Sequence, residues 1–244
     1  MTSSRPKRYV RTRILLFFTY LLHVLLFGLG RIFLRRVSME IRGTKHLHAL
    51  KESAIFAPNH ASVLDPSVLC IALARSRMLR NSLPLISVAR EKSFYKGMAY
   101  PQPYFYGGIL FKLLGALEVT PRSARDPNDK TEDTLAMHTQ LLLDGFFVLI
   151  FPEGAITRSG ELLPPKLGAA KLSQRTQRPI VPVAIKEAFQ LDPWKLIRGN
   201  VHIVVSFAKP MYPRPTSSFI PNEHFVAVSH ELMRNIGASL QNTD

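Results

Sequence analysis

The chain has 244 residues, which is enough for about one catalytic domain and an attachment segment. Its 32 Lys and Arg residues against 17 Asp and Glu give a formal net charge of +15. The single cysteine, Cys70, excludes an internal disulfide and offers no metal-ligand cluster. Because Cys70 lies in an apolar helical pattern, we expect an inert buried thiol rather than a nucleophile.

The positive charge is concentrated around one apolar run, residues 14–30. Residues 1–45 hold ten basic side chains against Glu40 alone (+9), whereas the other 199 residues hold 22 basic and 16 acidic side chains (+6). A 17-residue helix is about 25 Å long, short of a hydrocarbon core near 30 Å. Because basic residues flank this apolar run, we predict that residues 1–36 form a membrane anchor helix. Whether this helix spans the bilayer or lies in one leaflet stays open, because both flanks are basic.

Residues 37–244 alternate predicted strands with predicted helices. This order favours an α/β fold with a largely parallel central sheet flanked by helices. The expected strands are residues 37–42, 53–57, 85–89, 146–151, 179–185 and 201–207. The expected helices are residues 66–77, 104–115, 130–144, 168–174 and 222–240.

The strand predicted at residues 53–57 leads into the segment Asn59-His60-Ala61-Ser62-Val63-Leu64-Asp65. We expect Asp65 to be the N-cap of the next helix and Pro66 its first residue. An unbroken helix would separate His60 and Asp65 by ~140° around its axis, whereas a strand-loop-helix corner lets Asp65 fold back. A carboxylate bonded to one imidazole nitrogen leaves the other nitrogen free as a general base. The alternative is that Asp65 is a cap only and His60 a surface loop residue.

The strand predicted at residues 146–151 stops at Pro152-Glu153-Gly154, where a carboxylate stands beside a permissive glycine. Here the chain resembles the glycerolipid acyltransferase family, which includes the 1-acylglycerol-3-phosphate acyltransferases. Asn59, His60 and Asp65 match its first block, NHxxxxD, and residues 151–154 match its third, FPEG. The apolar strand around Pro182 matches its fourth, and the resemblance covers roughly residues 37–210.

Two blocks depart from the family pattern. Where the third block often continues as EGTRSRDG, this chain has Ala155 and Ile156, and Arg158 falls on a second basic position. The second block, usually GxIxxxR, has its arginine, Arg122, one place late. Displaced arginines change phosphate recognition, which depends on guanidinium forks at fixed geometry. The third block is closer to the branch that acylates lysophospholipids such as lysophosphatidylethanolamine.

The resemblance implies transfer of an acyl group from a thioester to a lipid hydroxyl, with His60 as the base and Asp65 as its orienting partner. It implies further substrate-binding residues, with Arg122 and Arg158 on the acceptor phosphate and Glu153 on its glycerol. The complete predicted substrate-binding set is Asn59, Arg122, Glu153, Gly154, Arg158 and Lys166. Ser62 lies near His60, but the sequence holds no G-x-S-x-G elbow, so we do not expect an acyl-enzyme hydrolase.

The expected acceptor is a lysoglycerophospholipid, first of all 1-acylglycerol-3-phosphate, which would give phosphatidate. The expected donor is acyl carrier protein or acyl-CoA, with no other cofactor and no metal. Another lysophospholipid, such as lysophosphatidylethanolamine, is the alternative acceptor, and a non-catalytic lipid-binding membrane protein is the alternative of another class. Nucleic acid is not an expected partner, because the charge flanks an apolar helix and no recognition motif is present. We expect the inner or cytoplasmic membrane, with the catalytic domain on its cytoplasmic side.

Overall fold

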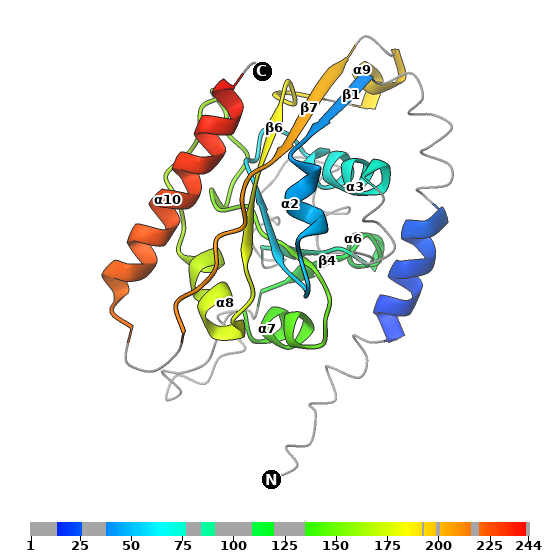
Figure 1. Ribbon diagram of the computed structural model, residues 1–244. Coiled ribbons are helices and arrows are strands. Elements are labelled where there is room, and N and C mark those ends of the chain that lie inside the picture. The colour runs from blue at the N-terminus through cyan, green and yellow to red at the C-terminus, as the bar shows by residue number, and fades with distance from the viewer. Residues whose placement is uncertain are drawn as a thin grey trace.

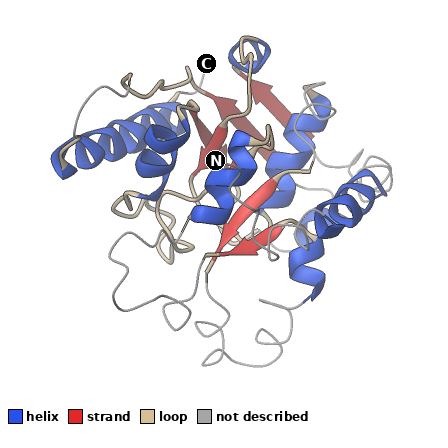
Figure 2. Cartoon of the chain, turned by 90° about the horizontal axis from the view of Figure 1, so that it is seen from below, coloured by secondary structure: helices blue, strands red, loops and turns tan. Residues whose placement is uncertain are grey.

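A computed structural model describes residues 14–25, 38–76, 84–90, 109–119, 135–191, 193–198, 201–215 and 220–242 of the chain. These residues form an α/β fold in which helices cover both faces of one sheet (Figures 1 and 2). The strands are β1 (Ser38–Arg42), β2 (Ile55–Pro58), β3 (Ile86–Ala89), β4 (Ala116–Glu118), β5 (Val148–Leu149), β6 (Ile180–Lys186) and β7 (His202–Phe207). The labelled helices are α2 (Thr44–His48), α3 (Asp65–Arg75), α6 (Ile109–Leu113), α7 (Ala136–Leu143), α8 (Gly168–Thr176), α9 (Pro193–Arg198) and α10 (Asn222–Gln241).

The strands lie in the order β1-β7-β6-β2-β5-β3-β4. All neighbouring pairs are parallel except β6 and β7. The prediction of a largely parallel sheet flanked by helices is therefore confirmed. Because β2, β3, β5 and β6 run in one direction, the loops that follow them leave the same edge of the sheet.

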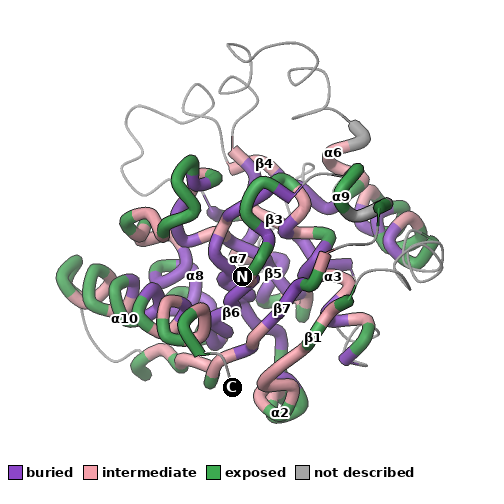
Figure 3. Tube along the Cα trace, turned by 90° about the horizontal axis from the view of Figure 1, so that it is seen from above, coloured by how far each residue is buried: buried purple, intermediate pink, exposed green. Residues whose placement is uncertain are grey.

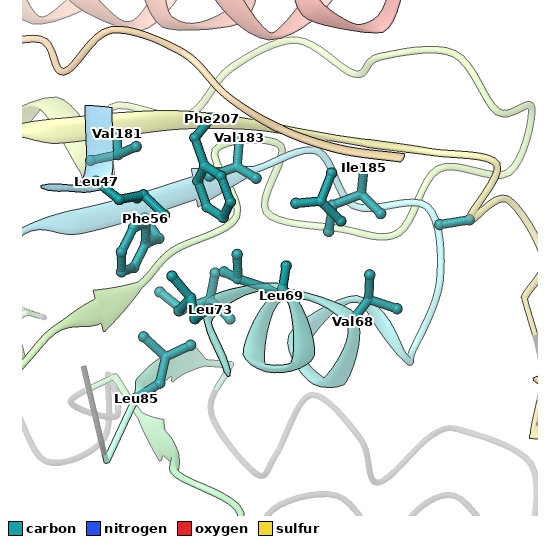
Figure 4. Close-up of a cluster of buried hydrophobic side chains, with 14 of the residues drawn as sticks. Leu47, Phe56, Val68, Leu69, Leu73, Leu85, Val181, Val183, Ile185 and Phe207 are labelled. Carbon is teal, nitrogen blue, oxygen red and sulfur yellow. The ribbon is translucent and has the colours of Figure 1, made fainter. Parts of the chain in front are cut away.

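The two faces of the sheet are packed by alternating side chains of the same strands. On β6, Val181, Val183 and Ile185 face Leu69 and the rest of α3 (Figure 4). On β2, Phe56 joins this same cluster, whereas its neighbours Ile55 and Ala57 pack on the other face with side chains of α8 and α10. A period of two, with both faces apolar, is what a strand covered on both sides requires.

Helix α3 departs from the prediction at its start. The helix begins at Asp65 itself, Leu64 is the N-cap residue, and no side chain caps the first turn. The predicted capping role of Asp65 is therefore wrong, because its carboxylate is turned back toward the loop that precedes the helix. Pro66 does lie in the first turn, as predicted.

Three elements were not expected: α2, α9 and the short strand β4. The predicted helix at residues 104–115 is present as α6, and that at residues 130–144 as α7, while residues 104–108 and 130–134 lie outside the described part of the chain.

A further helix covers residues 14–25, within the predicted anchor segment. Leu16, Thr19 and His23, at helical spacing, are buried, and Leu16 belongs to a core cluster with Ile86 and Leu117. The remaining surface of this helix is strongly apolar. Its exposed large side chains are Ile14, Phe17, Phe18, Tyr20, Leu21, Val24 and Leu25. Among the residues described, no helix combines the length and the hydropathy needed to cross a membrane.

Candidate active site

The loop between β2 and α3 brings His60 and Asp65 together. His60 Nδ1 lies 2.9 Å from Asp65 Oδ2, and the same oxygen accepts hydrogen bonds from the backbone N–H groups of Ala61 (2.8 Å) and Ser62 (2.9 Å). Because an ionised carboxylate only accepts, Nδ1 carries the proton and Nε2 holds the free lone pair. The imidazole also stacks on Phe151, with ring centroids 3.7 Å apart.

Burial differs sharply between the two partners. Asp65 is completely buried, whereas 16% of the His60 side chain is exposed to solvent. A buried carboxylate that receives three hydrogen bonds cannot rotate away, so the imidazole is held at a fixed orientation with its outer edge accessible. The strand-loop-helix corner expected from the sequence is thus present, and it does bring the pair together.

Glu153 ties this loop to the segment that follows β5. Its Oε1 accepts a hydrogen bond from the backbone N–H of His60 (2.7 Å), and its Oε2 accepts one from the backbone N–H of Leu163 (2.8 Å). The side chain is buried, and desolvation raises the pKa of its carboxyl, opposed by these two hydrogen bonds. Glu153 therefore positions the loop that carries His60, and its expected contact with the acceptor's glycerol stays a prediction.

Asn59 joins the end of β2 to β6. Its side-chain Nδ2–H₂ donates to the carbonyl of Ile185 (3.1 Å), and its Oδ1 accepts from the N–H of the same residue (2.7 Å). The amide thereby continues the pairing of the two strands beyond their last backbone contacts. Asn59 fixes the residue next to His60, and the contact with substrate that the sequence suggested for it remains untested.

Gly154 lies at φ 69°, in the left-handed region that favours glycine. Its carbonyl accepts hydrogen bonds from both Nε (2.9 Å) and Nη2 of Arg90, which directly follows β3. A Cβ on Gly154 would lie 3.2 Å from Cγ of Lys166, and the backbone N–H of Lys166 donates to the carbonyl of Pro152 (2.7 Å). Arg90 and the stem of Lys166 thus hold the glycine turn from two sides.

Of the two predicted phosphate-binding arginines, Arg158 lies on a segment beside His60. Thr157 donates its backbone N–H to the carbonyl of His60 (2.9 Å), and the next residue, Arg158, is exposed. Arg158 therefore lies on a segment that is hydrogen-bonded directly to the loop that carries His60. Arg122 lies outside the described residues.

Arg90 is the functional candidate that sequence interpretation missed. Arg90 directly follows a predicted strand, and this position indicates a possible ligand contact. In open α/β sheets, ligands bind beyond the carboxyl ends of the strands. Cys70, predicted to be a buried thiol, is only partly buried against the core, and desolvation raises the pKa of its thiol to about 12.

Comparisons with known proteins support the resemblance to glycerolipid acyltransferases. Residues 38–186 match the family described as Acyltransferase. A chloroplastic 1-acyl-sn-glycerol-3-phosphate acyltransferase of Brassica napus is 24% identical over 177 residues, which cover 71% of this chain and 45% of the relative. A probable 1-acyl-sn-glycerol-3-phosphate acyltransferase of Mycoplasma genitalium is 29% identical over 135 residues, covering 55% of this chain and 44% of the relative. The chain thus spans less than half the length of these curated relatives.

A solved structure shares the fold. The 1-acyl-sn-glycerophosphate acyltransferase PlsC of Thermotoga maritima superposes with a TM-score of 0.55 over 97% of this chain and 99% of that one, at 15% identity. Identity this low supports the fold alone. The match to the family, however, covers well over half of the chain and includes β2 to β6 with His60, Asp65 and Glu153. The chain therefore belongs to the acyltransferase family.

Proposed function

We propose that the protein transfers an acyl group from a thioester to the free hydroxyl of 1-acylglycerol-3-phosphate, giving phosphatidate and a free thiol. The observation that carries this proposal is the hydrogen bond between His60 Nδ1 and the buried Asp65. It leaves Nε2 as a base on the accessible side of the ring. A protein that only bound lipids would have no need of such a base.

In the proposed reaction, His60 Nε2 takes the proton from the acceptor hydroxyl as its oxygen attacks the thioester carbonyl. The imidazolium formed at that moment faces the negative charge of Asp65, which stabilises it. When the tetrahedral intermediate collapses, the C–S bond breaks and the imidazolium returns its proton to the departing thiolate. A positioned base of this kind contributes about 10²–10⁴-fold to the rate.

The acceptor's phosphate would be bound by Arg158 and Arg122, with Lys166 as a further cation beside the glycine turn. Arg158 is exposed on the segment whose backbone is bonded to His60, which suits a group that grips the polar end of a lipid while its hydroxyl reaches the base. Ile156, at the position where the family often has arginine, leaves the site with fewer cations than the usual pattern. That difference favours testing lysophospholipids with larger head groups, such as lysophosphatidylethanolamine, as a second acceptor class.

The membrane is the source of such acceptors, and we propose that the N-terminal segment attaches the enzyme to it. The outer surface of the helix at residues 14–25 exposes Phe17, Leu21 and Leu25, each with about half of its surface open to solvent. Apolar side chains in a row on a helix flanked by basic residues are typical of a helix that lies in the membrane interface.

The experiment that tests the proposed function is product identification by mass spectrometry. The purified full-length chain is given a panel of lysolipids, with lysophosphatidate, lysophosphatidylethanolamine and monoacylglycerol, in detergent micelles with acyl-CoA or acyl carrier protein. The expected result is phosphatidate with release of one thiol per product. Diacylated product from none of these acceptors with either donor would contradict the proposal, and product from lysophosphatidylethanolamine alone would reassign the acceptor.

A further inference from the structure

Four exposed apolar side chains lie on or beside the loop that carries His60. Val63 (52% exposed), Ile156 (38%), Phe189 (39%) and Trp194 (70%) come from three separate segments, and together they are called the mouth surface below. Large apolar side chains scattered singly on a surface are ordinary. Several beside one candidate site require a reason.

Hydrogen bonds place these segments beside the loop that carries His60. Trp194 lies next to Lys195, whose Nζ donates to the carbonyl of Gln190 (3.0 Å). Ile156 precedes Thr157, whose backbone N–H binds the carbonyl of His60 (2.9 Å). Phe189 precedes Gln190, whose backbone N–H binds the carbonyl of Ala61 (3.4 Å). Val63 belongs to the loop that carries His60. Three members of the mouth surface therefore lie within three residues of a direct contact with residues 60 and 61.

The segment after β6 is built to hold Phe189 outward. Its neighbours Ala188 and Leu191 are buried, and two non-glycine residues beside it take positive φ angles, Glu187 at 62° and Gln190 at 52°. Such angles cost a non-glycine residue free energy and persist only where the surroundings enforce them. The Phe189 ring packs against the backbone at Gly160, where an added Cβ would lie 3.4 Å from it. The exposed ring is therefore fixed in place rather than left at a loose loop tip.

The charges around the mouth surface favour an anionic partner. Arg158, Lys195 and Arg198 are exposed on the segments that carry Ile156 and Trp194, against exposed Glu161 and Glu187. Figure 3 shows the described part of α9 in the colour of exposed residues. The same protein carries +15 overall. Tryptophan, with an apolar body and one N–H donor, prefers the boundary between lipid chains and head groups.

We propose that the mouth surface docks on the interface of an anionic lipid bilayer, so that a lysolipid passes from the membrane to His60 without crossing water. This inference rests on the proposed function, because it takes the acceptor to be a membrane lipid. It names a contact separate from the helix at residues 14–25: that helix attaches the chain, whereas the mouth surface orients the site toward its substrate.

Trp194 is the only tryptophan of the chain, so its fluorescence reports on this surface alone. Full-length protein is mixed with phosphatidylglycerol vesicles, with and without brominated acyl chains, and with phosphatidylcholine vesicles as the neutral comparison. We expect a blue shift of Trp194 emission and quenching by the brominated lipid, stronger with the anionic vesicles. Protein that sediments with the vesicles while its Trp194 emission stays unshifted and unquenched would overturn the proposal.

A matched pair of variants adds a quantitative test. Phe189→Ser should lower the vesicle-partition coefficient about tenfold, the effect of withdrawing the exposed 39% of a phenyl ring from lipid. Tyr212→Ser is the control, because Tyr212 is 66% exposed but follows Met211, which pairs with the first residue of β6 at the opposite edge of the sheet. Equal effects of the two substitutions would contradict a specific docking surface.

Two further outcomes separate this inference from its rivals. If an acidic carrier protein shifts Trp194 emission without lipid while vesicles do not, the mouth surface binds the protein donor and the bilayer assignment is overturned. Docking is measured without turnover, so a chain that docks through Trp194 but forms no acylated product would contradict the proposed function and leave the docking surface supported.

Discussion

The carboxylate of Asp65 offers the sharpest prediction, because three donors converge on one of its oxygens. In Asp65→Asn, the amide oxygen must take the place of Oδ2, since an NH₂ group there would face the backbone N–H groups of Ala61 and Ser62. The His60 ring then still donates from Nδ1, and Nε2 remains the basic nitrogen. The substitution therefore removes the negative charge while keeping the tautomer.

The magnitudes follow from that geometry. Loss of the charged acceptor opposite the imidazolium costs roughly 1.5–3 kcal/mol, so kcat should fall about tenfold to a hundredfold with little change in KM. The new NH₂ group occupies the place of Oδ1, which is buried and has no hydrogen-bond partner among the described residues. An unsatisfied buried donor costs about 1–3 kcal/mol of stability, or a Tm lower by roughly 2–12 °C for a chain of this size.

Steady-state kinetics in micelles, thermal unfolding and ¹⁵N NMR of histidine would measure these three effects. An unchanged kcat would refute the role of Asp65 in stabilising the imidazolium. A shift of the His60 proton from Nδ1 to Nε2, with a loss far beyond a hundredfold, would refute the argument that backbone donors fix the orientation of the amide.

Three further predictions follow from the site. The pKa of Glu153 is raised above its ordinary 4.5 in the folded state, so the folded protein keeps this proton at pH values where the unfolded chain has lost it. The unfolding free energy of the parent, relative to that of Glu153→Gln, should therefore fall as pH rises above about 4.5. A difference that is flat or rises with pH in chemical denaturation would contradict this. Because desolvation raises the thiol pKa of Cys70 from 9.0 to about 12, iodoacetamide at pH 8 should label Cys70 in the folded protein far more slowly than in the unfolded chain, and Cys70→Ser should keep its activity. Arg158→Ala should raise the acceptor KM about tenfold to a hundredfold, because a charge-assisted hydrogen bond is lost, and should leave the donor KM nearly unchanged. Equal KM values for lysophosphatidate in parent and variant would contradict a role of Arg158 in the phosphate site.

The strands and the His60–Asp65 pair were predictable because their signals are local. A buried parallel strand reads as a continuous apolar run, and β2 and β6 lie where such runs were found. The run at residues 146–151 was equally apolar, yet only Val148–Leu149 forms a strand, β5. Its outer phenylalanines are apolar for other reasons, since Phe147 stacks on Phe56 and Phe151 stacks on His60.

The rest depended on contacts between distant parts of the chain. An aspartate before a proline is typical of an N-cap, and nothing local says that three donors from the preceding loop will draw its carboxylate backward. Likewise, the sequence places Glu153 at the end of a strand, but it cannot show that the side chain is buried and that both its oxygens accept from backbone N–H groups. The antiparallel placement of β7 beside β6 also has no local signature, because a strand's apolar pattern is the same in either direction.

The N-terminal run shows the reverse case, in which a local pattern was available and was overlooked. Leu16, Thr19 and His23 fall at helical spacing on one side of residues 14–25, and that side packs on the domain. Two polar residues in one stripe of an apolar helix indicate a face that contacts protein rather than lipid.

The central claim is that His60 Nε2 is the base, and the turnover of His60→Ala tests it most directly. Purified His60→Ala, compared with His48→Ala, a histidine exposed on α2, should have the circular dichroism of the parent protein. Its acyl transfer should fall by about 10²–10⁴-fold, while His48→Ala should transfer acyl groups at the parental rate. A folded His60→Ala protein that turns over as fast as His48→Ala would contradict the mechanism.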